Sequence, residues 1–124
     1  MVEALLLVLG AALALLIHEG AHALVALANG QDVTAFRPYP HRYAGRLYVG
    51  RCWVWPYDPD DIGFHVAPAV ASFVLAAGWL AVGLWPLAIG LAVDHIWWWL
   101  GWFRIRFTSD GKRSDGWKVR QALR

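Results

Sequence analysis

The stretch VEALLLVLGAALALLIHEGAHALVALA, residues 2–28, is apolar except for Glu3 and a short group of ionisable residues near its end. A helix of this length is about 40 Å long, whereas the hydrocarbon core of a bilayer is about 30 Å thick. Asn29-Gly30 follows, a pair that commonly ends a helix. A cleaved signal peptide is the alternative, but such peptides begin with positive charge and here the only early charge is Glu3. We therefore predict a retained transmembrane helix over residues 2–28.

The ionisable group in this stretch reads His18-Glu19-Gly20-Ala21-His22, which is the pattern H-E-x-x-H. Residues four apart lie on one helix face, so His18 and His22 can share one tetrahedral zinc ion. Glu19 can then reach a zinc-bound water as its general base. The alternative is that both histidines are buried polar residues bonded to neighbouring helices. Three ionisable groups within one turn are costly in hydrocarbon, which favours the metal interpretation.

The composition is typical of a membrane protein. Of the 124 residues 59% are hydrophobic, only 16% are charged and nine are Trp. The single cysteine, Cys52, excludes an intramolecular disulfide and a cysteine-based zinc site. The chain carries no phosphate-binding loop and no RNA-binding signature, so we expect no nucleic-acid partner. We expect one domain, residues 1–124, integral to a bilayer that we take to be a prokaryotic cell membrane.

Residues 31–61 form the only long polar stretch, and four prolines exclude a helix across it. The segment 46–55 is rich in aromatic and β-branched residues, and residues 32–37 could pair with it across a turn within 41–45. This pattern predicts a β-hairpin at the membrane surface, the alternative being an irregular loop with interfacial aromatic side chains.

From residue 62 to residue 105 the chain is again mostly apolar, and Trp85-Pro86 is a natural break. We predict helices over about 64–84 and 87–106, followed by a basic tail over 107–124. The fold class is thus an all-α integral membrane protein with three transmembrane helices and a small β-hairpin between the first and second.

The positive charges predict the orientation of these helices. All eleven Lys and Arg lie either in the loop after the first helix or from Arg104 to the end of the chain. With three spans, that loop and the C-terminal tail lie on the same side of the membrane. By the positive-inside rule we expect residues 31–61 and the C-terminus to be cytoplasmic.

Two histidines leave a zinc site one protein ligand short. The candidates for the third ligand are Asp94, His65, His95, His41, Asp110 and Asp115. By helix rise, His18 and His22 lie about 24 and 30 Å along the first helix, whereas Asp94 lies about 12 Å from the outer end of the third. Their depth in the membrane therefore disfavours Asp94 as the third ligand, whereas His65 and the two Asp-Gly pairs of the tail remain candidates.

A transmembrane H-E-x-x-H helix, a hairpin-like loop, two further spans and a late Asp-Gly pair together resemble the site-2 protease family of intramembrane zinc metalloproteases. The resemblance implies that His18 and His22 are zinc ligands and that Glu19 is the general base. It covers the three-helix core of the family and most of this chain.

The resemblance also implies that a later S-D-G or L-D-G motif supplies an Asp as the third zinc ligand. Ser114-Asp115-Gly116 and Ser109-Asp110-Gly111 both have this form. We prefer Asp115, because the motif of the family opens a short amphipathic helix and residues 117–123 can form one. Asp110, His65 and Asp94 remain alternatives.

The implied activity is zinc-dependent endoproteolysis of a transmembrane or membrane-proximal protein substrate. An unwound substrate could add as a strand to the edge of the 33–54 hairpin. The chain lacks the Asn-containing N-x-x-P segment of the family, since its only Asn is Asn29. The duties of that segment would fall to other residues, for which His65 and Arg104 are candidates. The alternative function is a catalytically inactive metal-binding membrane scaffold or pseudoprotease, which the missing segment favours and the intact Glu19 disfavours.

Overall fold

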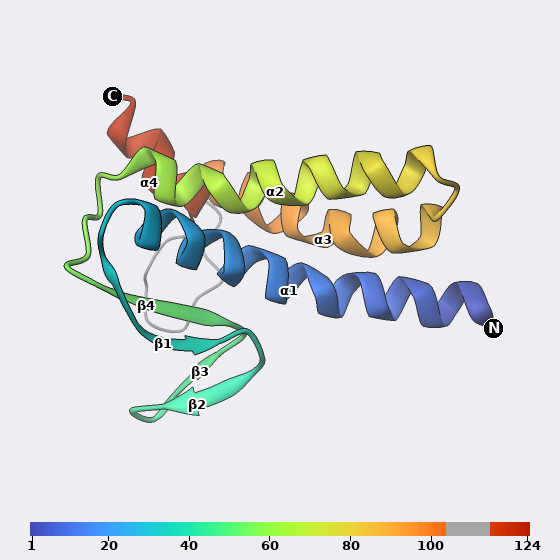
Figure 1. Ribbon diagram of the computed structural model, residues 1–124, viewed down its shortest axis with the longest axis horizontal. Coiled ribbons are helices and arrows are strands. Elements are labelled where there is room, and N and C mark those ends of the chain that lie inside the picture. The colour runs from blue at the N-terminus through green and yellow to red at the C-terminus, as the bar shows by residue number, and fades with distance from the viewer. Residues whose placement is uncertain (104–114) are drawn as a thin grey trace.

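Helix α1 spans Val2–Ala28 and is the longest element of the fold in the computed structural model, which describes residues 1–103 and 115–124. Two further long helices, α2 (Ile62–Ala81) and α3 (Trp85–Trp102), pack against it, and a short helix α4 (Asp115–Ala122) lies near the chain's C-terminus (Figure 1). The described chain is thus mostly helical. Its N-terminus and the α2–α3 turn lie at one end of the bundle, and α4 lies at the other (Figure 1).

The helix boundaries follow local chemistry. Gly30 adopts a positive φ of 72° directly after α1, which is the conformation that ends a helix without steric cost. Helix α2 begins two residues before the predicted start, because the Asp61 carboxylate caps it by accepting the Phe64 N–H at 3.0 Å. Helix α3 begins at Trp85 rather than at residue 87, since Pro86 lies in its first turn, where a missing N–H costs nothing. The predicted end of this helix near residue 106 lies outside the described residues.

The polar stretch between α1 and α2 forms two short antiparallel ladders rather than the single hairpin ladder that we predicted. Strand β1 (Asp32–Arg37) pairs with β4 (Arg51–Trp55), and β2 (His41–Tyr43) pairs with β3 (Arg46–Tyr48). Prolines 38 and 40 lie between β1 and β2 and cannot donate to a ladder, which divides the pairing. Only the end of the predicted turn region is a turn: residues 41–43 form strand β2, and positive φ angles at Ala44 and Gly45 close the inner ladder.

The β1–β4 ladder lies beside the C-terminal half of α1, and the β2–β3 ladder lies farther from it (Figure 1). A small apolar core joins them to the bundle, with Ala26 from α1, Val54 from β4 and Phe64 from α2 all buried. This core fixes the hairpin over the part of α1 that carries the H-E-x-x-H motif.

Helices α1 and α3 touch through their backbones at a pair of glycines. A Cβ built on Gly10 would lie 2.4 Å from the Leu87 carbonyl oxygen, and one built on Gly90 would lie 2.3 Å from that of Leu7. Only glycine fits at these positions, so the contact sets both the distance and the relative level of the two helices.

Helices α1 and α2 are each long and apolar enough to cross a membrane, by length and composition alone, among the described residues. Only 22% of the most apolar window of either helix is buried inside the molecule. The three long helices carry exposed aliphatic and aromatic side chains, among them Leu5, Val8, Val70, Phe73, Val74, Ile89, Val93 and Ile96.

Candidate metal centre

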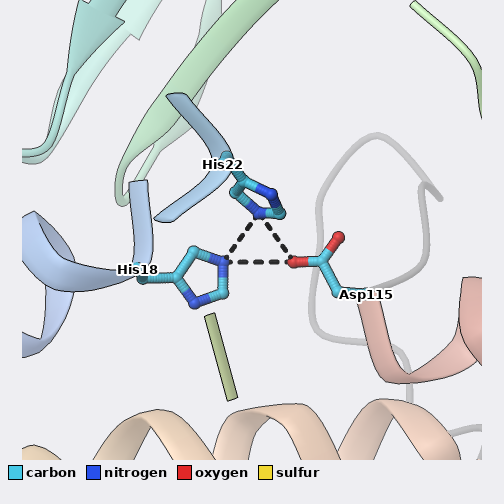
Figure 2. Close-up of side chains that lie close together, drawn as sticks. All are labelled: His18, His22 and Asp115. Carbon is cyan, nitrogen blue, oxygen red and sulfur yellow. Dashed lines mark hydrogen bonds and ion pairs between the residues drawn. The ribbon is translucent and has the colours of Figure 1, made fainter. Parts of the chain in front are cut away.

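Three side chains from two distant parts of the sequence converge at one point. The Nε2 atoms of His18 and His22, both on α1, lie 3.2 Å apart, and each lies 3.1 Å from Oδ2 of Asp115 at the start of α4. Figure 2 shows the resulting triangle of two nitrogens and one oxygen. These three residues form the group that could hold a metal ion in the described part of the chain.

The second nitrogen of His18 is already occupied. Its Nδ1 lies 2.6 Å from Oδ1 of Asp94 on α3, and Oδ2 of Asp94 accepts a hydrogen bond from the Ser72 hydroxyl of α2 at 2.8 Å. Asp94 and Ser72 are 8% and 0% exposed. A carboxylate can only accept here, so Nδ1 carries a hydrogen, and a neutral His18 ring would present the lone pair of Nε2 toward the triangle.

The second nitrogen of His22 is occupied as well, by a backbone group. Its Nδ1 donates to the carbonyl oxygen of Phe64 at 2.8 Å. That carbonyl is free to accept because the residue four positions later, Pro68, has no N–H to give it within α2. In a neutral His22 ring the Nε2 atom would therefore also present a lone pair.

Asp115 is held by contacts on both sides. Its Oδ1 lies 2.7 Å from Nδ1 of His65 on α2, a side chain only 1% exposed, and 3.8 Å from Nζ of Lys118. Burial by itself would raise the pKa of the Asp115 carboxyl, but its contacts with the imidazoles of His18, His22 and His65 hold it well below its usual range. The group is therefore an ionised carboxylate that turns one oxygen to the triangle.

Gly116 explains how α4 comes close enough to supply this carboxylate. A Cβ built on it would lie 2.1 Å from the Trp98 carbonyl oxygen of α3. The guanidinium of Arg120, one turn further along, donates to the Trp102 carbonyl oxygen at 2.8 Å and fastens the same helix to the C-terminal end of α3. The glycine of the Asp-Gly pair thus permits the close approach of α4 to α3.

The donor set fits a metal ion. Two neutral imidazoles and one carboxylate are typical ligands of zinc, and bonds of about 2.0–2.1 Å to a tetrahedral ion would place neighbouring ligand atoms about 3.3 Å apart. The three observed separations, 3.1 to 3.2 Å, are close to that value and nearly equal. Three lone-pair atoms at these distances repel one another unless a metal ion or a proton lies among them.

Glu19 lies beside this group, under the hairpin. It is 7% exposed, and a Cβ built on Gly50 would lie 3.1 Å from its Oε1. The backbone of Cys52 on β4 offers it a hydrogen bond. The hairpin thus covers the carboxylate that the sequence assigned as general base.

Three of the six candidates for the third ligand lie close to the two histidines, but only Asp115 joins the triangle. His65 and Asp94 do not join the triangle; His65 contacts Asp115, and Asp94 contacts His18. His41 packs between Tyr39 and Tyr48 in the hairpin, and His95 packs near Phe73. Asp110 and Arg104 lie outside the described residues.

The depth argument that placed Asp94 too far from the histidines was wrong. Gly10 lies opposite Leu87 and Gly90, so about two turns of α1 project beyond the start of α3 (Figure 1). From that contact His18 lies about 12 Å further along α1 and Asp94 about 9 Å further along α3, close to the same level. The error came from assuming that both helices begin at one plane.

Reasoning from the sequence missed the roles of Ser72, of the Phe64 carbonyl and of Gly50. One signal was available for Ser72, because polar side chains on separate apolar helices tend to pair with one another.

Comparison of the chain with protein-family models, with curated proteins and with solved structures found no match to any of them.

Proposed function

We propose that this chain is a membrane-embedded zinc endopeptidase of the site-2 protease type. The observation that carries the proposal is the convergence of His18 Nε2, His22 Nε2 and Asp115 Oδ2 beside a buried glutamate. When bound there, zinc would supply a Lewis acid for the substrate carbonyl and a water of lowered pKa. A family relationship remains part of this proposal and rests on the resemblance described above.

The residues of the chain would divide the remaining work. His18, His22 and Asp115 would hold the ion. Glu19 would take up the proton of the attacking water and give it to the departing amine. The hairpin over Glu19 would limit access of bulk water, and an extended substrate segment would add to an edge of its ladders, which are two-stranded.

The exposed apolar surface supports a membrane location. Soluble monomers rarely expose continuous apolar patches above a few hundred Å², and core helices of soluble proteins are mostly buried. Here the apolar windows of α1 and α2 are 22% buried. We propose that α1, α2 and α3 all cross the bilayer, and that the substrate is a transmembrane or membrane-proximal protein.

A catalytically inactive metal-binding scaffold is the second candidate. One observation favours it: Oε1 of Glu19 lies against Gly50 of the hairpin rather than within the ligand triangle. Both candidates predict a metal ion, and only the first predicts peptide hydrolysis.

Two measurements test the proposal. Zinc content of the detergent-purified protein should be about one ion per chain, and it should be lost in His22→Ala and in Asp115→Ala. New N-termini in the membrane proteins of an expressing host should appear with the wild type and decrease about 100- to 10,000-fold with Glu19→Gln, which keeps its zinc. Zinc binding without Glu19-dependent cleavage would exclude the peptidase and support the inactive scaffold. A wild type that binds no zinc would exclude both candidates.

A further inference from the structure

A buried carboxylate in the middle of an apolar helix requires an explanation. Asp94 is 8% exposed on α3, and ionisable groups at such positions are costly unless they are paired and serve a purpose. Both of its oxygens are engaged, one by Nδ1 of His18 at 2.6 Å and the other by the Ser72 hydroxyl at 2.8 Å. The three groups come from α1, α2 and α3, so this contact joins all three long helices.

We propose that Asp94, held by Ser72, is a positioning residue that fixes the ring orientation and the tautomer of His18 for metal binding. The inference rests on the metal centre of the proposed function, and it adds two residues that neither the H-E-x-x-H motif nor the Asp-Gly pair contains.

The physical argument concerns the two nitrogens of one imidazole. Without a partner at Nδ1 the ring of His18 could turn about its side-chain bonds or carry its hydrogen on Nε2, and in either case the lone pair would leave the triangle. The Asp94 carboxylate accepts the hydrogen of Nδ1 and so keeps the lone pair on Nε2. Its negative charge also makes the ring a stronger donor to a cation.

Ser72 contacts Asp94 and not His18 itself, so it acts on the ligand through that carboxylate. A carboxylate with a single hydrogen-bond partner can rotate about its Cβ–Cγ bond, whereas one held at both oxygens cannot do so freely. The Ser72 hydroxyl is fully buried and lies on a helix different from that of Asp94. Its effect on the metal therefore passes through Asp94, and a loss of Ser72 should have no further effect once Asp94 is gone.

The test is the zinc dissociation constant of the purified protein, measured by competition with a chromophoric chelator. We expect Asp94→Ala to weaken zinc binding about 10- to 100-fold, and Asp94→Asn to weaken it less, because the amide oxygen can still accept from Nδ1. Ser72→Ala should weaken it by a smaller factor, and Ser72→Ala with Asp94→Ala should be no weaker than Asp94→Ala alone. His95→Leu, at the next position of the same helix, is the matched control and should leave the constant unchanged.

A spectroscopic measurement separates positioning from a merely structural role. Cobalt in the same site absorbs visible light with a band pattern that depends on ligand geometry and donor strength, and Asp94→Asn should shift that pattern. If Asp94 only joined helices, its variants would lower the melting temperature while the folded protein kept the zinc constant and the cobalt spectrum of the wild type, and the inference would fail. If Asp94→Ala does not fold, the zinc constant and the cobalt spectrum of Asp94→Asn and Ser72→Ala test the inference in its place.

The same measurements distinguish a failure of this inference from a failure of the proposed function. A wild type that binds zinc and shows the Asp94 effect, yet cleaves nothing, would overturn the peptidase and support this inference. A wild type that binds zinc with variants indistinguishable from it would overturn only the inference. A wild type that binds neither zinc nor cobalt would overturn both.

Discussion

At the scale of single residues, the thiol of Cys52 offers a probe of Glu19. Burial, together with the negative charge of Glu19, raises the pKa of this thiol to about 11. Because the thiolate is the reacting form, alkylation by iodoacetamide should be slow at pH 7 and should increase with a midpoint near pH 11. In metal-free Glu19→Gln the charge is gone and burial remains, so we expect a lower midpoint that still exceeds the usual value of about 8.5.

The measurement is the rate of alkylation against pH, followed by mass spectrometry. Glu3→Gln removes a carboxylate of the same helix far from the hairpin and should leave the midpoint unchanged. A midpoint that does not move in Glu19→Gln would show that the carboxylate does not act on the thiol, contrary to the described contact between Glu19 and β4.

At this scale, spacing in the sequence identifies only the part of the site that lies within one helix. Residues 18, 19 and 22 are brought together by one turn of one helix, so their proximity needs no knowledge of the fold. Asp115 is distant in sequence, and of the two Ser-Asp-Gly copies it was preferred because a helix was expected to follow it; residues 115–122 do form a helix. The partners of the ligands, Asp94 and His65, depend on how three helices pack, which no local pattern encodes.

At the scale of elements, the approach of α4 to α3 depends on one glycine. In Gly116→Ala the new Cβ would meet the Trp98 carbonyl oxygen at 2.1 Å, a distance that backbone movement alone can relieve. We expect α4 to shift, a loss of about 1–3 kcal/mol in the free energy of unfolding, and zinc binding weakened more than about 10-fold although every ligand is present.

The matched control lies inside the H-E-x-x-H motif itself. A Cβ built on Gly20 has nothing within 4 Å, so Gly20→Ala should bind zinc as the wild type does. Zinc affinity of the two variants, with circular dichroism to confirm folding, makes the comparison. Equal affinity in both would mean that α4 does not depend on the close contact with α3.

A second prediction at this scale concerns the proline inside α2. Pro68→Ala supplies an N–H that can bond the Phe64 carbonyl in the ordinary helical pattern, in competition with Nδ1 of His22. We expect α2 to become no less stable, and zinc binding to weaken about ten-fold. Such opposite changes in stability and affinity would not arise from general damage to the fold.

The control for this variant is Pro86→Ala. Pro86 lies in the first turn of α3, where an N–H has no helical partner, so the substitution should change neither zinc affinity nor thermal stability appreciably. Zinc affinity in Pro68→Ala equal to that of the wild type would show that the orientation of His22 does not require the free carbonyl.

The element boundaries were predictable where a local signal exists. Asn29-Gly30 and Trp85-Pro86 marked the end of α1 and the break between α2 and α3 to within a few residues. The relative level of α1 and α3 was not predictable in the same way, because it is set by the contact of Gly10 with Gly90. Glycines in a helix signal close packing, but a single sequence does not say which glycine meets which.

At the scale of the whole molecule, the arrangement of basic residues and exposed apolar side chains supports the orientation that we propose for the membrane. The N-terminus and the α2–α3 turn lie at one end of the bundle, whereas α4 lies at the opposite end (Figure 1). The hairpin carries Arg37, Arg42, Arg46 and Arg51, and α4 carries Lys118 and Arg120. The segments that carry the basic residues can be read from the sequence alone, because charge and hydropathy do not depend on side-chain packing.

The prediction is that the hairpin faces the cytoplasm and the α2–α3 turn faces outward. In a Cys52→Ser background, Leu47→Cys places a thiol on β3 and Leu84→Cys places one at the turn, both at side chains that are exposed. A membrane-impermeant maleimide added to intact cells should label the cysteine at 84 and spare the one at 47. After the cells are permeabilised, both should react, which controls for accessibility of the thiol. The reverse pattern would be consistent with three spans but with the opposite orientation of the protein. Labelling of both sites in intact cells would place them on the same side of the membrane, which would contradict the proposal that α2 crosses the bilayer between them.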